Sequence, residues 1–225
     1  MTKTALNELT LPANILLAGA SGSGKSYWTR HTLLPIIKGQ YDILVICSPT
    51  LDVNGDYDFI EEKPNKIFKV QHNIPQAIAE LIDSQADLFK QFNSKIIKRD
   101  QIPRICVILD DCLSSNVFDD RGILSKFAIK SRHYQMSFIC MTQRIAGISR
   151  QFRINCSYFT GFSVMCYSEL ERIVMEYVPK KFQKGFQDKL IDLYDTKYNF
   201  IFINNREQQI SNRLFKNGTE LIQFD

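Results

Sequence analysis

The stretch Gly19-Ala20-Ser21-Gly22-Ser23-Gly24-Lys25-Ser26 decides the fold of this chain. It matches the pattern G-x-x-x-x-G-K-[S/T] in full. The apolar run 13–18 directly before it indicates a buried strand, and residues 26–38 after it have helical character. A strand, a glycine-rich turn and a helix in this order are the context of a phosphate-binding loop. A chance turn of glycine and serine is the alternative.

Each residue type in this loop suits the phosphates of a nucleotide. Glycines let the backbone wrap around phosphate oxygens, and the N-terminus of the following helix adds positive potential. Lys25 would reach the β- and γ-phosphates, and the Ser26 hydroxyl would supply one ligand to Mg²⁺. We therefore predict that eight residues bind nucleotide: Gly19, Ala20, Ser21, Gly22, Ser23, Gly24, Lys25 and Ser26.

A second apolar strand ends in two acidic residues. Asp110 and Asp111 directly follow the run 105–109. An aspartate in this context holds Mg²⁺, which assigns Asp110 to the metal through water. Asp111 would point differently, and we predict that it polarises the attacking water as a general base. The alternative is that Asp111 caps the helix or loop that follows.

The strand predicted at 137–142 ends in a polar amide, Gln143. Ligands gather at the carboxyl ends of strands in a parallel sheet. Gln143 would then lie near the γ-phosphate, where it could sense that group or orient water. A strand-end amide without a catalytic role is the alternative.

Strands alternate with helices along the chain, which predicts a mostly parallel sheet with helices on both faces. Pro35 is expected to kink or end the helix 26–38. Four further segments are expected as a loop at 50–65, helices at 74–92 and 117–133, and a strand at 209–215 that leads to a hairpin turn at Asn217-Gly218.

The composition is that of a globular protein. The 225 residues are 44% hydrophobic and 23% charged, and their number suits one α/β domain. The longest apolar runs are far shorter than a membrane helix requires, and the N-terminus lacks the apolar core of a secretory signal. No CxxC pair occurs among the six cysteines, so we expect reduced thiols in a cytoplasm-like compartment.

The positive charge is concentrated in one region. The formal net charge is +4, and residues 121–168 hold seven basic side chains and no acidic one. A field of one sign suits the phosphates of a nucleotide or of nucleic acid. The alternative is a solvated face that acids from elsewhere in the fold balance.

Four segments together resemble the FtsK–HerA superfamily of P-loop ATPases, and most of all its viral genome-packaging branch. They are GASGSGKS at 19–26, DILVICSPT at 42–50, ICVILDD at 105–111 and SRHYQMSFICMTQ at 131–143. The resemblance covers about residues 10–165. It implies a RecA-like (ASCE) α/β fold with an additional strand between the phosphate-loop strand and the acidic strand. Cellular relatives commonly carry glutamate where this chain has Asp111, whereas the Asp-Asp pair is similar to the viral branch.

The resemblance also implies a ring, usually of six subunits, around double-stranded DNA. ATP would be hydrolysed at subunit interfaces, where a neighbour contributes an arginine. The candidates all lie in the acid-free stretch, with Arg132 as first choice and Arg150 as second, ahead of Arg144 and Arg153.

The function implied is a Mg²⁺-dependent ATPase that translocates double-stranded DNA into a viral capsid. Its partners would be DNA, copies of itself and capsid vertex proteins, in the host cytoplasm or the virion. The chain is expected to be one domain, 1–225, with a motor core at about 10–165 and C-terminal helices and a hairpin at about 166–225. A nucleoside or nucleotide kinase with the same loop, and a nucleotide-binding structural switch, remain as alternatives.

Overall fold

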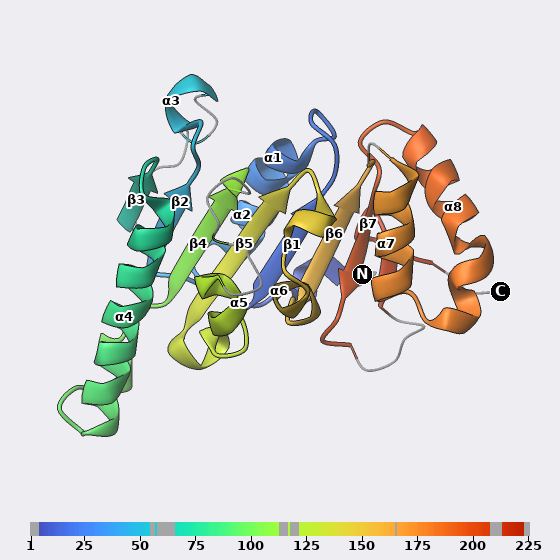
Figure 1. The fold of residues 1–225 in the computed structure, drawn as a ribbon. Coiled ribbons are helices and arrows are strands. Elements are labelled where there is room, and N and C mark those ends of the chain that lie inside the picture. Colours follow the sequence, from blue (N-terminus) through green and yellow to red (C-terminus); the bar gives the residue numbers. More distant parts are fainter. Residues whose placement is uncertain are drawn as a thin grey trace.

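The computed structural model centres on one continuous sheet. It describes residues 5–54, 57, 66–112, 117, 122–164, 166–207 and 213–222. Within these residues nine strands pair in the order β3-β2-β4-β5-β1-β6-β7-β8-β9 (Figure 1). The strands are β1 (Asn14–Ala18), β2 (Ile43–Cys47), β3 (Lys66–Val70), β4 (Ile105–Asp110), β5 (Met136–Thr142), β6 (Tyr158–Phe162), β7 (Phe200–Asn204), β8 (Leu214–Lys216) and β9 (Glu220–Leu221).

The six strands from β3 to β6 are parallel, and the last three are antiparallel additions. β5 lies between the phosphate-loop strand β1 and the acidic strand β4. This is the additional strand that the resemblance implies, and the mostly parallel RecA-like α/β fold is confirmed. We call the side of the sheet where β1, β4 and β5 end its carboxyl edge, and the opposite side its amino edge.

Alternate residues of the central strands enter two different cores, because successive side chains of a strand point to opposite faces. On β1, Leu16 belongs to one hydrophobic cluster, while Ile15 and Leu17 belong to the other. β1 and β5 are buried along their whole length. This explains why these strands are mostly apolar on both faces rather than alternating between apolar and polar residues.

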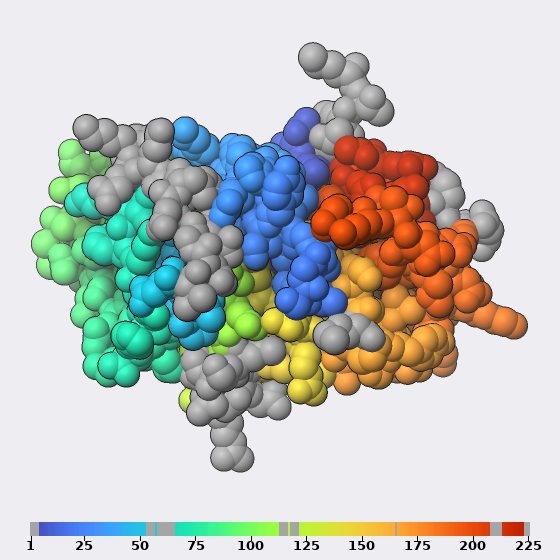
Figure 2. All heavy atoms as spheres, turned by 90° about the horizontal axis from the view of Figure 1, so that it is seen from above, coloured from blue at the N-terminus to red at the C-terminus, as the bar shows by residue number. Residues whose placement is uncertain are grey.

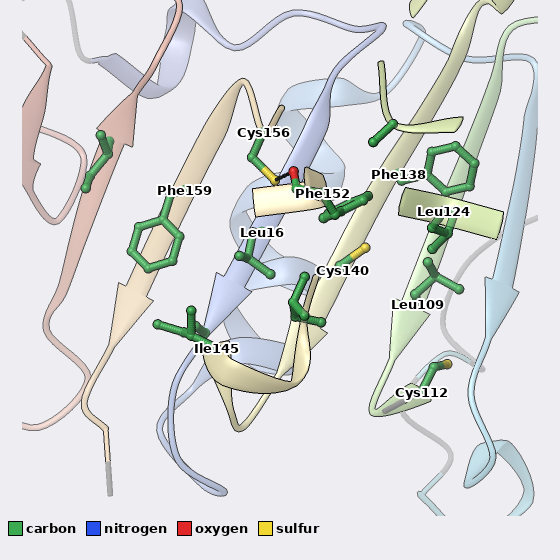
Figure 3. Packing of buried hydrophobic residues seen from close by; sticks show 14 of the residues in the cluster. Leu16, Leu109, Cys112, Leu124, Phe138, Cys140, Ile145, Phe152, Cys156 and Phe159 are labelled. Carbon is green, nitrogen blue, oxygen red and sulfur yellow. Dashed lines mark hydrogen bonds between the residues drawn. The ribbon is translucent and has the colours of Figure 1, made fainter. Parts of the chain in front are cut away.

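Helices cover both faces, as predicted. One face carries α4 (Ile74–Asn93), α5 (Ile123–Phe127), α6 (Arg150–Ile154), α7 (Tyr167–Tyr177) and α8 (Gln183–Asp195) (Figure 1). Figure 3 shows Leu16, Phe138 and Phe159 of the sheet within the core beneath these helices. The other face is covered by a helical segment made of α1 (Lys25–Trp28), a π turn (Thr29–Leu33) and α2 (Leu34–Ile37).

Two predicted helices differ from the structure. Pro35 does not end its helix, which passes through a π turn at Thr29–Leu33 just before the proline and continues to Ile37. The prediction of one helix over 117–133 is wrong: α5 stops at Phe127, and a 3-10 helix follows at Ser131–Tyr134. The break occurs where the carbonyl of Ala128 accepts a hydrogen bond from the Asn14 amide. Residues 118–121 of that prediction lie outside the described residues.

Smaller differences concern loops and edges. The predicted loop 50–65 begins with a short helix, α3 (Leu51–Asn54), and its residues 55–56 and 58–65 lie outside the description. Of the strand predicted at 209–215, residues 214–215 belong to β8 and 208–212 are not described. The hairpin at Asn217-Gly218 is confirmed, and both residues have positive φ as a tight β-turn requires.

All six cysteines are free thiols, and five of them are buried. Among the helices described, none has both the length and the apolar composition to cross a bilayer. The sheet continues from the predicted motor core through β7, β8 and β9. That continuity supports the prediction of a single domain over 1–225, which stays a prediction.

Candidate nucleotide and magnesium site

The phosphate loop connects β1 to α1 at the carboxyl edge, near the centre of the face seen in Figure 2. Gly22 and Gly24 adopt φ of 71° and 101°, values that side chains disfavour. Gly19 has ordinary dihedrals but no room, because a Cβ there would lie 2.7 Å from the Cβ of Phe162. These three glycines are therefore required by backbone conformation or by close packing.

Lys25 lies in the middle of the site. Its ammonium donates to the carbonyls of Gly19 (2.7 Å) and Ala20 (2.8 Å) at the base of its own loop. Burial lowers the pKa of Lys25, while the charges of Asp110 and Asp111 act in the opposite direction. The ammonium is thus held between loop carbonyls and two carboxylates, where it can meet phosphate oxygens.

The two aspartates follow different paths at the end of β4. Asp110 is the last strand residue, and its Oδ2 accepts a hydrogen bond from the hydroxyl of Tyr57 at 2.9 Å. Asp111 has a left-handed φ of 51°, which Asp tolerates better than most residues. Gln143 Nε2 lies 3.4 Å from Asp111 Oδ2, at the limit of a hydrogen bond. The strand-end amide and the second aspartate are therefore neighbours, as the parallel sheet predicts.

These side chains border one polar hollow of about 280 Å³ at the carboxyl edge. Its lining contains seven residues predicted for the site: Ser21, Gly22, Lys25, Ser26, Asp110, Asp111 and Gln143. Thr50, Met141 and Thr142 complete it. The structure thus brings together residues from three separate predicted motifs.

Arg132 and Arg150 lie outside this hollow. Arg132 is exposed in the 3-10 helix before β5, at the amino edge. Arg150 is exposed at the start of α6. Within one chain neither residue lines the hollow, so a contact of either with a nucleotide there would require a second copy of the chain.

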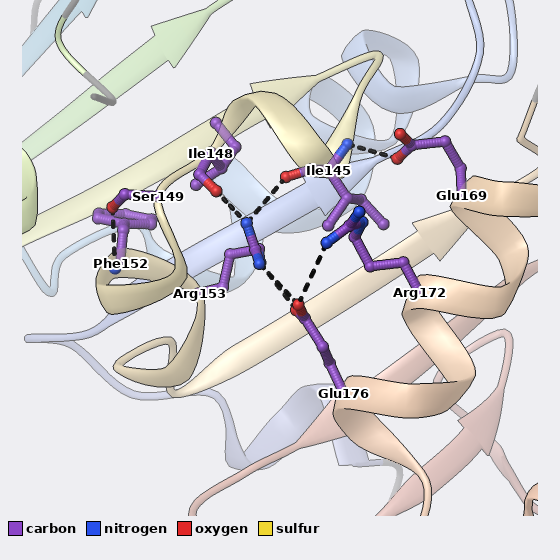
Figure 4. A network of polar contacts seen from close by, with 8 residues as sticks. All are labelled: Ile145, Ile148, Ser149, Phe152, Arg153, Glu169, Arg172 and Glu176. Carbon is purple, nitrogen blue, oxygen red and sulfur yellow. Dashed lines mark hydrogen bonds and ion pairs between the residues drawn. The ribbon is translucent and has the colours of Figure 1, made fainter. Parts of the chain in front are cut away.

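Arg153 is hydrogen-bonded to partners within its own chain (Figure 4). Its guanidinium binds both oxygens of Glu176, at 2.8 and 2.6 Å, and donates to the carbonyls of Ile145 and Ile148. Its side chain is buried, with 5% of the residue exposed. Arg153 is therefore a structural residue. Its charge is balanced by Glu176 of α7, in agreement with the alternative prediction that acids from elsewhere in the fold balance the acid-free stretch. Nearby, Glu169 accepts from the N–H of Ile145 at 2.7 Å, so α7 braces the loop that follows Gln143.

Sequence reasoning missed two residues beside the aspartates. Tyr57 lies in an acidic, turn-rich stretch, and no pattern in the sequence relates it to Asp110. Thr50 carried a signal, because it follows the end of β2, the strand next to β4. A polar residue at that position belongs to the same carboxyl edge as Asp110.

Comparison with solved structures returns the same fold. Genome packaging NTPase B204 from Sulfolobus turreted icosahedral virus 2, in complex with ATP-gammaS, is 15% identical, with a TM-score of 0.62 over 95% of this chain and 98% of that one. The pCW3 conjugation coupling protein TcpA, with ATPgS, is 18% identical over 95% of this chain and 61% of that one, with a TM-score of 0.61. EssC (ATPases 2 and 3) from Geobacillus thermodenitrificans is 20% identical over 70% of this chain and 33% of that one, with a TM-score of 0.54. At these identities the likeness shows the fold.

Sequence comparison gives the family. No curated protein sequence matches the chain. The family model described as Poxvirus A32 protein matches residues 3–213, which is nearly the whole chain and includes the phosphate loop, both aspartates and Gln143. The chain belongs to the poxvirus A32 protein family.

Proposed function

We propose that this protein is an ATP-hydrolysing translocase that packages double-stranded DNA into a viral capsid. The observation that carries the proposal is the hollow in which Lys25 and Ser26 meet Asp110, Asp111 and Gln143. Membership of the poxvirus A32 family supports it, and so does the shared fold with genome packaging NTPase B204, which was solved with ATP-gammaS and AMPPCP. Among the described residues, no feature favours the kinase or the structural switch over this function.

The phosphate loop would hold the nucleotide by its phosphates. The N–H groups of Gly19, Ala20 and Ser23 donate to carbonyls within the chain, so the other N–H groups of residues 19–26 and the start of the helical segment would face the negative charge. Lys25 would exchange its carbonyl partners for β- and γ-phosphate oxygens. Burial lowers the pKa of Lys25, and the charges of Asp110 and Asp111 oppose that lowering.

The oxygen donors beside the loop fit Mg²⁺. Ser26 offers a hydroxyl and Asp110 a carboxylate, and Mg²⁺ prefers a few such ligands together with waters and substrate phosphates. No cluster of three or more His, Cys, Asp or Glu side chains suited to a metal occurs among the described residues, so nothing there forms an all-protein cage. When bound, Mg²⁺ would neutralise charge on the β- and γ-phosphates. Tyr57, which donates to Asp110 Oδ2, would fix the orientation of that carboxylate.

Asp111 and Gln143 would handle the attacking water. Asp111 is exposed at the mouth of the hollow, and Gln143 lies within hydrogen-bond range of its carboxylate. We assign Asp111 as the base that accepts a proton from water, and Gln143 as the amide that orients this water toward the γ-phosphorus.

An arginine from a neighbouring subunit would complete the site. Arg132 is our first choice and Arg150 our second, because both are exposed and neither pairs with an acid among the described residues. This role requires a ring, which we propose to be a hexamer around DNA. Contacts with DNA would then be made by basic side chains on its phosphates, without reading of bases. Capsid vertex proteins, in the host cytoplasm or in the virion, would be the further partners.

The experiment is an ATPase assay of the full chain with and without double-stranded DNA, run beside a measurement of mass in solution. We expect Mg²⁺-dependent hydrolysis that DNA stimulates, and a mass that corresponds to a ring under the active conditions. Lys25→Ala is the control that removes phosphate binding. Phosphate transfer to a nucleoside monophosphate without stimulation by DNA would overturn the proposal in favour of a kinase. Binding of ATP without any turnover would favour the switch.

A further inference from the structure

A second hollow borders the phosphate loop on its other side. It has a volume of about 630 Å³, within the range of pockets that hold small ligands. Gly22, Lys25 and Ser26 border both hollows. The polar hollow lies toward β4 and β5, whereas the second one is lined by Phe162 of β6 and by Tyr198, just before β7. The loop therefore separates an acidic side from an aromatic side.

Tyr198 lies directly against the loop. A Cβ added to Gly24 would lie 3.2 Å from Cδ1 of Tyr198, so the ring and the loop backbone are in contact. In Figure 2 the orange segment that follows α8 lies beside the blue segment of the phosphate loop. Even so, 59% of Tyr198 is exposed. The ring thus forms a wall beside the phosphates while much of its surface stays available.

The turn that carries Tyr198 is held in an unusual conformation. Tyr198 has φ of 68°, a region that a bulky residue rarely adopts. Its neighbour Asn199 donates to the carbonyl of Leu193 at 3.1 Å and accepts from the Asn217 amide at 2.9 Å. The end of α8 and the β8–β9 hairpin therefore fix the turn, and strain of this kind accumulates where a side chain must be aimed.

The other aromatic residues of this hollow have different surroundings. Trp28 is buried and packs edge-on against Phe162 and Phe200, so it belongs to the core. Tyr27 is 70% exposed, with its ring 4.3 Å from that of His31 on the next turn of the helix. Tyr198 combines an exposed ring with a close approach to the backbone of Gly24. The ammonium of Lys197 lies over the ring of Tyr198, 5.0 Å from the ring centroid, and the Lys197 side chain is exposed.

We propose that Tyr198 stacks on the base of the bound nucleotide and that the aromatic hollow holds its nucleoside part. The inference rests on the proposed function, in which the γ-phosphate points toward Asp110, Asp111 and Gln143. A nucleotide whose phosphates lie on the loop must then extend its nucleoside to the other side, where the aromatic hollow is. Stacking accepts any base, because every base has a π-face, so Tyr198 provides affinity without selecting adenine. The segment 166–225 thereby contributes to the site through its turn.

The test compares ligands with and without a base. Binding of ATP, GTP and inorganic tripolyphosphate to the full chain is measured with Mg²⁺ for wild type, Tyr198→Ala and Tyr198→Phe. We expect Tyr198→Ala to weaken ATP and GTP by the same factor, about 5- to 150-fold, because loss of one base–aromatic stack has that size. Tripolyphosphate should bind unchanged, and Tyr198→Phe should bind all three ligands as the wild type does. Phe68→Ala is the control, since it removes a ring that is 52% exposed on β3, far along the sheet.

Other outcomes separate the two proposals. Unchanged affinity of Tyr198→Ala for ATP, with loss of binding in Lys25→Ala, overturns the role of Tyr198 and leaves the proposed function intact. An equal loss for ATP and tripolyphosphate also overturns it, because Tyr198 would then only support the loop. If the wild type binds none of the three ligands, the proposed function fails and this inference fails with it.

Discussion

The polar side chains at the two edges of the sheet differ in how fully they are hydrogen-bonded within the chain. At the amino edge the polar groups satisfy one another. Asn14 donates to the carbonyls of Ala128 and Asn155 and accepts from the Ser131 hydroxyl, and Gln85 donates to the carbonyls of Pro103 and Tyr134. Asp42 and Arg104 form a two-point ion pair just before β2 and β4.

At the carboxyl edge, polar side chains of the same kinds keep hydrogen-bonding capacity that other described residues do not use. The buried Ser23 hydroxyl has no hydrogen-bond partner among the described residues. Asp111 is exposed, and its contact with Gln143 is long at 3.4 Å. Because these groups lie beside the phosphate loop, a ligand there can use their remaining hydrogen-bonding capacity. The contrast teaches that the amino edge stabilises the sheet, whereas the carboxyl edge is prepared for phosphates.

The largest expected effect is a loss of turnover caused by a residue of the amino edge, which is an exception to this contrast. Arg132 lies at the amino edge, yet we assign it to the active site of a neighbouring subunit. Arg132→Ala should lower kcat in the DNA-stimulated ATPase about 10³- to 10⁵-fold, as loss of an arginine finger does. The free energy of unfolding should change by less than about 0.5 kcal/mol, because the residue is exposed. Lys130→Ala, an exposed cation two residues away, is the matched control.

Mixing of variants tests whether Arg132 acts in trans. Arg132→Ala supplies an intact phosphate loop, and Lys25→Ala supplies an intact arginine. Mixed rings should therefore regain part of the activity that each variant alone lacks. Wild-type turnover in Arg132→Ala together with a collapse in Arg150→Ala would transfer the role to our second choice.

The next effect would sharpen the contrast, because it lies on the carboxyl edge. Asp111→Asn should lower kcat about 10²- to 10⁴-fold, the size of a general-base contribution, while binding of ATP is retained. Unfolding in urea should occur at the wild-type midpoint, because Asp111 is exposed and, among the described residues, its carboxylate meets the amide of Gln143 at the limit of a hydrogen bond. Normal turnover with stability lowered by about 1 kcal/mol would show instead that Asp111 is a cap. Asp111→Glu is the informative companion, since it keeps the base and tests its reach.

The carboxyl edge was the more predictable of the two. The phosphate loop is a local pattern, and the parallel sheet brings the residues after β4 and β5 beside it by simple register: Asp110 pairs with Met141, two residues before Gln143. Tyr57, Tyr198 and Glu176 were not predicted in their places, because each depends on contacts between distant segments. Arg153 illustrates the difficulty. Its positive charge suggested binding of phosphate, but its partner Glu176 lies outside the acid-free stretch of the sequence. The break after α5 was missed for the same reason, because the Ala128 carbonyl at the break bonds to Asn14 on β1, a segment distant in sequence.

A smaller effect tests the amino edge itself. Asn14→Leu should lower the free energy of unfolding by about 1–3 kcal/mol, because the Asn155 carbonyl loses the Asn14 amide, while the Ala128 carbonyl and the Ser131 hydroxyl keep only their bond to each other. Turnover per folded molecule should stay at the wild-type level, measured well below the unfolding midpoint. Ser131→Ala removes one donor only and should cost less. A loss of kcat in Asn14→Leu that exceeds its loss of folded protein would contradict the division between the edges.

The smallest effect concerns the ion pair Asp42–Arg104. Hydrogen bonds from Arg104 hold the pKa of Asp42 below its ordinary value of 3.8. Near pH 3.8 the unfolded chain therefore binds more protons at Asp42 than the folded one, so the pair's contribution is present above this pH and disappears as pH falls through the lowered pKa. Both side chains are more than two-fifths exposed, so the contribution is less than about 1 kcal/mol.

Arg104→Gln measures this contribution. The difference in free energy of unfolding between wild type and Arg104→Gln should be constant from pH 7 to about pH 5 and should shrink below pH 3.8. Added salt should reduce it further, because the pair is open to solvent. A difference that does not depend on pH would mean that Arg104 acts through packing of its stem rather than through Asp42. Even then the amino edge would differ from the carboxyl edge, because Arg104→Gln would change the stability of the sheet and would leave turnover unchanged.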